Sequence, residues 1–265
     1  MVNYKSICDD IVEAVIETGK FIREESSGFD IGMTESKGLN DFVSYVDKGS
    51  ERMLVEKLGI ILPEAGFITE EGTSVKKGLK YCWVIDPLDG TTNFLHGLHP
   101  YSISVALMED DEIVAGVVYE AGGNEIFTAL KNRGAWLNGQ PVHVSAAPSL
   151  SDSLIATGFP YSDFSRLENF MDSLTHFCKT THGIRRLGSA SIDLAYVACG
   201  RFEAFYEYGL HPWDVAAGIL LVREAGGRVS DFSCNEENVS GDEIVAANNL
   251  VFPEFLENVS KFMLG

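Results

Sequence analysis

Two aspartates, Asp86 and Asp89, stand three residues apart at the end of the apolar segment 81–85. The aromatic and β-branched residues of this segment predict a short buried strand. Acids at the end of a buried segment cost free energy unless a partner compensates their charge. A structural turn explains an Asp-Gly step but not two acids, so metal binding and a turn both remain open for this pair.

The residues that follow the two acids are suited to contact with an anion. Pro87 is expected to stop regular strand pairing, and Gly90 to let the backbone come close to a ligand. Thr91 or Thr92 is expected to cap a new helix, whose free N–H groups favour an anion. Carboxylates are hard oxygen ligands, so their place beside an anion site suggests Mg²⁺ holding a phosphate, with one metal ion or two.

Further carboxylates fall where a predicted strand ends or a predicted helix begins: Glu70, Glu71, Glu207, Asp214 and Asp47. Each has an ordinary alternative explanation. An acid at a helix start usually caps the helix or offsets its dipole, and a Glu-Glu pair after a strand is usually a solvated turn. The arginine pair at 185–186 could grip a phosphate or a partner subunit, or form an ordinary ion pair.

The composition limits the classes of function. The formal net charge of -19 argues against binding to nucleic acid or to an anionic membrane, because both need clustered Lys and Arg. An acidic protein attracts an anionic substrate only if cations neutralise its site, so the charge favours several metal ions. Nucleotide-binding P-loop, serine-hydrolase elbow and zinc-helix patterns are absent from the sequence.

The cysteines and the hydropathy pattern point to the cytoplasm. The 5 cysteines show no C-x-x-C spacing and lie mostly in apolar segments, which favours free thiols in a reducing compartment. The N-terminus lacks a signal-peptide pattern, and no apolar run is long enough to span a membrane.

Helices and strands are expected to alternate along both halves of the chain, without regular βαβ units. This order predicts a layered α/β or α+β fold, read as a single domain over residues 1–265 with possible sub-lobes at 1–150 and 151–265. A loop, with a short hairpin as the alternative, is expected at 25–40. Helices are predicted at 4–22, 42–58, 164–177, 189–199, 213–225 and 253–262, and strands at 65–69, 81–85, 102–108, 113–120, 125–130, 154–157, 201–207, 228–231 and 244–247.

Two long motifs resemble those of a known family. Residues 83–94, WVIDPLDGTTNF, resemble the first signature of the inositol monophosphatase family, W-x-I/V-D-P-I/L-D-G-T-x-N-F. Residues 213–218, WDVAAG, followed by EAGG at 224–227, resemble its second signature. The likeness covers nearly the whole chain, including residues 41–47, 69–71, 183–190 and 246–249, and two motifs in the right order make it specific.

The resemblance implies an α/β/α/β/α layered sandwich, usually a homodimer, that hydrolyses small phosphate monoesters with two to three Mg²⁺ ions and is sensitive to lithium. It places the first Mg²⁺ on Glu70, Asp86 and the Leu88 carbonyl, and the second on Asp86, Asp89 and Asp214. A third ion would lie near Glu70 through waters. Thr91, oriented by Asp47, would help to deprotonate the attacking water, so that Thr91, Asp47 and Glu70 are the implied catalytic residues.

The resemblance also implies the substrate contacts. The backbone N–H groups of Gly90 and Thr91 would receive the phosphate, while Glu207 and the turn of Gly188, Ser189 and Ala190 would meet the alcohol. Thr92-Asn93 and Glu207 resemble the inositol-phosphatase branch, which favours a polyol phosphate, and myo-inositol 1-phosphate is the leading substrate hypothesis. The alternatives are fructose 1,6-bisphosphate, histidinol phosphate or a 3′-phosphoadenosine nucleotide, and a non-catalytic regulator that binds metal or phosphate. No nucleic acid or membrane partner is expected.

Overall fold

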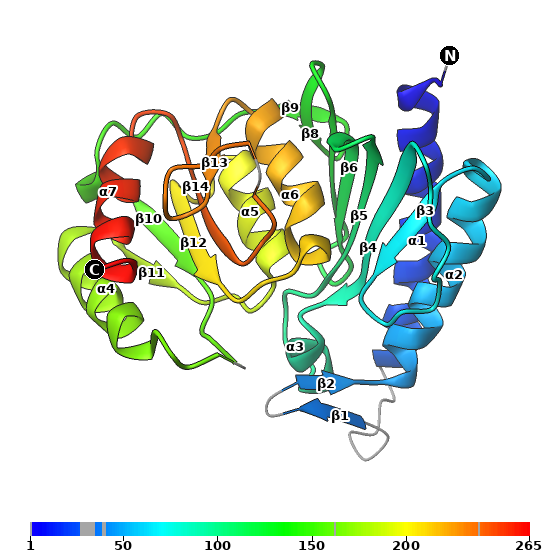
Figure 1. Ribbon diagram of the computed structural model, residues 1–265, viewed down its shortest axis with the longest axis horizontal. Coiled ribbons are helices and arrows are strands. Elements are labelled where there is room, and N and C mark those ends of the chain that lie inside the picture. Colours follow the sequence, from blue (N-terminus) through cyan, green and yellow to red (C-terminus); the bar gives the residue numbers. More distant parts are fainter. Residues whose placement is uncertain (1, 27–34, 39–40, 162, 238) are drawn as a thin grey trace.

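The computed structural model describes residues 2–26, 35–38, 41–161, 163–237 and 239–265. Helices and two large sheets alternate in five layers, as Figure 1 shows from right to left. This order, helix pair, sheet, helix pair, sheet, helix pair, is the predicted α/β/α/β/α sandwich.

The first two layers are a helix pair and a mixed sheet in the order β3-β4-β5-β6-β7-β8-β9. Helix α1 confirms the helix predicted at 4–22, and its apolar residues at helical spacing, including Ile7, Ile11 and Val15, are buried against this sheet. Only β3 and β4 are parallel; the other neighbours are antiparallel. The elements are α1 (Tyr4–Ser26), α2 (Tyr45–Ile61), β3 (Gly66–Thr69), β4 (Tyr81–Asp89), β5 (Ser102–Glu109), β6 (Glu112–Glu120), β7 (Glu125–Leu130), β8 (Gly134–Leu137) and β9 (Gln140–Val142).

The middle layer consists of α5 (Ala190–Ala198) and α6 (Pro212–Glu224), which are apolar around most of their circumference. A helix that is apolar on all sides belongs in the interior, and both helices lie between the two sheets. The second signature therefore lies at the centre of the molecule, where α6 packs on the first sheet.

The remaining layers are the second sheet, in the order β11-β10-β12-β14-β13, and the helix pair that covers its outer face. Strand β12 is parallel to β10 and antiparallel to β14. The elements are β10 (Leu154–Thr157), β11 (Gly183–Arg185), β12 (Ala204–Tyr208), β13 (Arg228–Ser230), β14 (Glu243–Ala247), α4 (Leu167–Thr180) and α7 (Phe252–Met263).

Some predicted boundaries are wrong by a few residues. Helix α2 begins three residues late because Ser44 caps it and forms a capping box with Asp47. Helix α4 also begins later than predicted, and β8 and β9 were not predicted. The hairpin alternative within 25–40 is confirmed in part by the pair β1 (Glu35–Gly38) and β2 (Asp41–Val43), while residues 27–34 and 39–40 lie outside the described part of the chain.

Strand β4 is interrupted by a bulge where the prediction placed the end of pairing. Asp86 pairs with Ser104, and the next pair along the strand is Asp89 with Ser102, so β4 has one residue more than β5 over this interval. The extra residue falls at Pro87 and Leu88, where a proline is tolerated because it has no N–H to donate. The strand continues to Asp89, beyond the predicted end at residue 85.

Among the described residues, no helix is both long enough and apolar enough to cross a membrane.

The contact between the first sheet and α6 leaves little room for a side chain at Gly116. A Cβ there would stand 3.1 Å from the Cα and carbonyl oxygen of Ala217. We expect Gly116→Ala to lower the free energy of unfolding by about 1–3 kcal/mol, because backbone must move. In the control Gly59→Ala the nearest atom is 3.9 Å away, so stability should be unchanged or higher. Urea unfolding measures both; equal stabilities would contradict the tight contact.

Candidate active site

A cavity of about 390 Å³ brings together residues from both halves of the chain. Its walls come from the ends of β3 and β4, the loop into α3 (Thr91–Leu95), the start of α5, the end of β12 and the start of α6. The lining residues include Glu70, Asp86, Leu88, Asp89, Gly90, Thr91, Gly188, Ser189, Ala190, Glu207 and Asp214. Of the predicted site residues, only Asp47 is not among those that line it.

Asp86 is the most deeply buried acid of the cavity, at 2% exposed. Its Oδ1 accepts a hydrogen bond from the Leu88 N–H at 2.9 Å, which the bulge makes possible. Burial raises the pKa of Asp86 well above its ordinary value, and repulsion by Glu70, Asp89 and Asp214 raises it further. Three neighbouring acids therefore act on the charge of Asp86.

Asp89 is held by the start of α5. Its Oδ2 accepts from the Ser189 hydroxyl at 2.7 Å, the Ser191 N–H at 2.8 Å and the Ser191 hydroxyl at 2.6 Å. Burial, with repulsion by Asp214, raises the pKa of Asp89 to about 6, although these donors oppose the shift. Ser189 occupies the N-cap position of α5 but does not cap it with its side chain, because its hydroxyl is used on Asp89.

Asp214 and Asp47 combine two uses that the sequence left as alternatives. Each stands at the third residue of a helix and accepts the N-cap N–H with its Oδ2, Asp214 from His211 at 2.6 Å and Asp47 from Ser44 at 2.8 Å. Asp47 Oδ1 then accepts from the Thr91 hydroxyl at 3.0 Å. Their role as helix caps is confirmed, and it also orients both acids toward the cavity region.

Thr91 does not cap α3, and the expectation that Thr91 or Thr92 would do so is wrong. The N-cap is Gly90, in the left-handed conformation with φ 89°. The Thr91 hydroxyl lies 3.0 Å from both Asp47 Oδ1 and the Leu88 carbonyl oxygen. Gly90 is required here because a Cβ would come within 3.1–3.2 Å of the carbonyl oxygens of Gly188 and Pro100, besides the strain of its φ.

Another part of the cavity wall is formed by Glu207 and the turn at 188–190. Glu207 is 7% exposed, and burial, followed by repulsion from Asp214 and Asp89, raises its pKa well above the ordinary value. Gly158 lies so close that a Cβ there would be 1.8 Å from Glu207 Oε1. Arg186 lines this wall too, with its guanidinium 5.7 Å from the ring centre of Phe159.

The donor set suits Mg²⁺. Glu70, Asp86, Asp89, Asp214 and the Leu88 carbonyl offer only hard oxygens, and Mg²⁺ prefers such ligands. The raised pKa values of Asp86 and Asp89 arise in part from mutual repulsion, which a divalent cation between them would relieve. The side chains as placed are not a finished coordination sphere, since no three His, Cys, Asp or Glu groups of the described residues stand close enough to hold an ion.

Comparisons of sequence and structure with known proteins all match this chain to the inositol monophosphatase family and its SuhB relatives over nearly its full length. The sequence profile of the inositol monophosphatase family matches residues 4–262. The chain is 40% identical over 252 residues to the inositol-1-monophosphatase of Rhizobium meliloti, covering 95% of both chains. It is also 40% identical over 253 residues to the Nus factor SuhB of Pseudomonas aeruginosa, covering 94% of this chain and 93% of the relative. The crystal structure of extragenic suppressor protein suhB from Bartonella henselae matches with a TM-score of 0.91 at 35% identity, covering 97% of this chain and 99% of that one.

Asp193 is an additional buried acid that sequence reasoning missed, because nothing in the apolar pattern of α5 marks it. It is 1% exposed, and its Oδ1 has no hydrogen-bond partner among the described residues. Burial, then repulsion by Glu207 and Asp89, raises its pKa well above the ordinary value. The folded protein therefore keeps this proton to a higher pH than the unfolded chain does.

The raised pKa of Asp193 predicts how Asp193→Asn changes stability with pH. In the wild type this group favours folding fully below about pH 4, and its contribution falls as pH rises toward the folded pKa, by about 1.4 kcal/mol per unit. Asparagine does not titrate. Relative to wild type, Asp193→Asn should therefore gain about 1 kcal/mol or more between pH 4 and pH 7, measured by urea unfolding in EDTA. The control is Asp9→Asn on the exposed side of α1. A difference from wild type that does not change with pH would refute the expectation.

Proposed function

Because the chain belongs to the inositol monophosphatase family, we propose that it hydrolyses a small polyol phosphate monoester with Mg²⁺, and that myo-inositol 1-phosphate is its substrate. The observation that carries the proposal is one cavity lined by Glu70, Asp86, Asp89, Asp214 and Thr91, whose hydroxyl is hydrogen-bonded to Asp47 behind it. Phosphate monoesters hydrolyse extremely slowly without a catalyst, so neutralisation of charge and positioning must supply most of the acceleration.

Two or three Mg²⁺ ions would be held by these acids. Glu70, Asp86 and the Leu88 carbonyl would hold the first ion, and Asp86, Asp89 and Asp214 the second, with Asp86 shared. Bound Mg²⁺ would lower the pKa of the attacking water and neutralise charge on the phosphate and the departing alcohol. The protein's part is to hold its carboxylates in place before substrate arrives, through the Leu88 N–H on Asp86 and the serine donors on Asp89.

The proton of the attacking water would pass to the pair of Thr91 and Asp47. Thr91 has one hydroxyl hydrogen, and when it points to Asp47 Oδ1 the threonine oxygen can accept a proton from water. Asp47 is fully buried, and burial raises its pKa, which suits a carboxylate that receives a proton. The backbone N–H groups of Gly90 and Thr91 would bind the phosphate, and water would attack in line without a phosphoenzyme.

The alcohol part of the substrate would lie against Glu207 and the turn of Gly188, Ser189 and Ala190. A carboxylate facing a cavity accepts hydrogen bonds from neighbouring hydroxyls, which supports a polyol over an apolar alcohol. Fructose 1,6-bisphosphate, histidinol phosphate and 3′-phosphoadenosine nucleotides are the alternative substrates within the same chemistry. We further propose that the enzyme is inhibited by Li⁺, forms a homodimer and is located in the cytoplasm. The cytoplasmic location is supported by the cysteines, which are all free, as is usual in a reducing compartment.

A second candidate role is that of a Nus factor. It is favoured by the relative of that name, which is as similar to this chain as the inositol-1-monophosphatase is. The acidic surface, with a net charge of -19, suits protein partners better than direct contact with nucleic acid. A Nus factor role that survived the loss of turnover in Asp89→Asn would reside outside the cavity.

The first test is phosphate release from myo-inositol 1-phosphate with Mg²⁺ and with EDTA, beside fructose 1,6-bisphosphate and histidinol phosphate. We expect Mg²⁺-dependent release, fastest from the inositol ester. Asp89→Asn should lower kcat by more than about 100-fold, the upper range for changes that only orient a metal ligand. The control Asp111→Asn in the exposed turn after β5 should be fully active. Full activity of Asp89→Asn, or release that is unaffected by EDTA, would contradict the proposal.

The contact of Gly158 with Glu207 gives a test of the substrate wall. The added methyl group in Gly158→Ala would displace the Glu207 carboxylate, removing a charged hydrogen-bond acceptor worth about 1.5–3 kcal/mol. We expect kcat/KM for the inositol ester to fall about 10- to 100-fold, while the Mg²⁺ concentration for half-maximal activity stays the same. Steady-state kinetics on Gly158→Ala and the control Gly59→Ala measure both quantities. An unchanged kcat/KM would remove Glu207 from the substrate site.

A further inference from the structure

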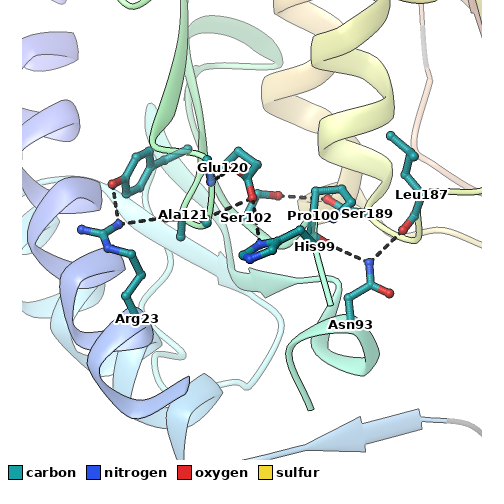
Figure 2. A network of polar contacts seen from close by, with 12 residues as sticks. Arg23, Asn93, His99, Pro100, Ser102, Glu120, Ala121, Leu187 and Ser189 are labelled. Carbon is teal, nitrogen blue, oxygen red and sulfur yellow. Dashed lines mark hydrogen bonds and ion pairs between the residues drawn. The ribbon is translucent and has the colours of Figure 1, made fainter. Parts of the chain in front are cut away.

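Ser102 is a buried serine on β5 that is absent from the predicted site, yet it contacts both serines that hold Asp89. Its side chain is fully buried, and its hydroxyl oxygen lies 3.0 Å from that of Ser189 and 2.7 Å from that of Ser191. Figure 2 shows Ser102 facing Ser189 between the first sheet and the start of α5. In the strand ladder, Ser102 is also the residue paired with Asp89 across β4 and β5.

The hydrogen atoms of this cluster can be assigned by counting. A serine hydroxyl carries one hydrogen, and Ser189 and Ser191 both use theirs on Asp89 Oδ2. Ser102 must therefore be the donor in this cluster, and its single hydrogen goes to the nearer oxygen, that of Ser191 at 2.7 Å. The hydroxyls form a directed chain from Ser102 through Ser191 to the carboxylate. Each donor in such a chain polarises the next and strengthens its bond.

The chain of donors acts on one oxygen only. Three hydrogen bonds converge on Oδ2 of Asp89, while Oδ1 receives none from the described residues. A carboxylate held in this way cannot turn about its Cβ–Cγ bond without losing all three. Outer hydrogen bonds of this kind orient the ligands of metal ions and tune their affinity.

The segment 187–191 is also fixed at its other end. The side-chain amide of Asn93 donates to the carbonyl oxygens of Pro100, at 2.7 Å, and Leu187, at 2.8 Å (Figure 2). Asn93 therefore holds the residue before Gly188, and Ser102 holds the residues that follow it. The contacts with Ser189 and Ser191 are the only hydrogen-bond contacts of the Ser102 hydroxyl in the described part of the chain.

We infer that Ser102 is a positioning residue, which acts through Ser191 and Ser189 to orient the Asp89 carboxylate for a divalent cation. This inference rests on the proposed function, since it assigns Asp89 to a Mg²⁺ site. Ser102 does not touch the substrate or the ion. Its effect is on the affinity for Mg²⁺.

The test measures Mg²⁺ binding directly, by isothermal titration calorimetry and by the rise of Tm with Mg²⁺ concentration, on Ser102→Ala and wild type without substrate. We expect Ser102→Ala to bind Mg²⁺ about tenfold more weakly, the lower end for the loss of an outer hydrogen-bond partner, and to need correspondingly more Mg²⁺ for half-maximal phosphate release. KM for the substrate at saturating Mg²⁺ should stay close to wild type. The control is Ser230→Ala, a fully buried serine on β13 whose hydroxyl donates to the Asp231 carbonyl.

A double-mutant cycle separates positioning from general destabilisation. Ser102→Ala and Ser191→Ala act through the same Asp89 oxygen, so the double variant should bind Mg²⁺ no more weakly than the worse single variant. A lower Tm in Ser102→Ala with Mg²⁺ affinity within twofold of wild type would overturn the inference, and so would additive losses. Wild type that binds no Mg²⁺ would instead refute the proposed function, so the two failures are distinguishable.

Discussion

Repulsion among buried carboxylates is the constraint on which the rest of this structure depends. Asp86, Asp89, Asp214 and Glu207 are brought together from three different layers, and burial and mutual repulsion raise the pKa of several of them. A fold that holds like charges so close must stabilise them by other means. Three apolar cores, two outside the sheets and one between them, provide that stability and keep the acids from separating.

In several acids of the site the two oxygens have different roles: one is held by the protein's own hydrogen-bond donors, which fixes the carboxylate in place. In Asp47, Asp89 and Asp214, Oδ2 is satisfied by donors of the protein's own backbone or serines. The acids are therefore tied to helix starts and cannot swing away from one another. Asp86 is tied in the same manner through Oδ1 by the bulge in β4. Asp47 and Asp214 therefore cap helices and keep a second oxygen for another partner. Helix capping and a role in the site, which are alternatives for these acids on sequence alone, do not exclude each other.

Much of this arrangement could be predicted from the sequence, because long periodic segments and two specific motifs carry a strong signal. The three sequential strands of the first sheet, the helix of the second signature and the two caps follow from residue type and spacing alone. Other features depend on tertiary contacts. From sequence alone Thr91 is a candidate N-cap, but in the structure the N-cap is Gly90 and the Thr91 hydroxyl is bonded to Asp47, which is far away in the sequence. Ser102, Ser191 and Gly158 are ordinary residues in their own segments, and only the meeting of β5, α5 and β12 gives them their contacts. Strands β8 and β9 are too short to show a period.

The order of the site residues along the chain bears on how the protein is made. Asp86 and Asp89 lie on β4 of the first sheet and Glu70 directly follows β3, whereas Asp214 and the donors on Asp89 lie in or at the start of the middle helices, which follow much later in the sequence. During synthesis from the N-terminus, the first sheet can emerge with its acids close together but without the helices that orient them. The full set of cavity acids can therefore assemble only when the central helix pair has been made and has packed between the sheets. A chain that ends before these helices would carry the acids of the first sheet without Asp214 and without the serine donors that orient Asp89.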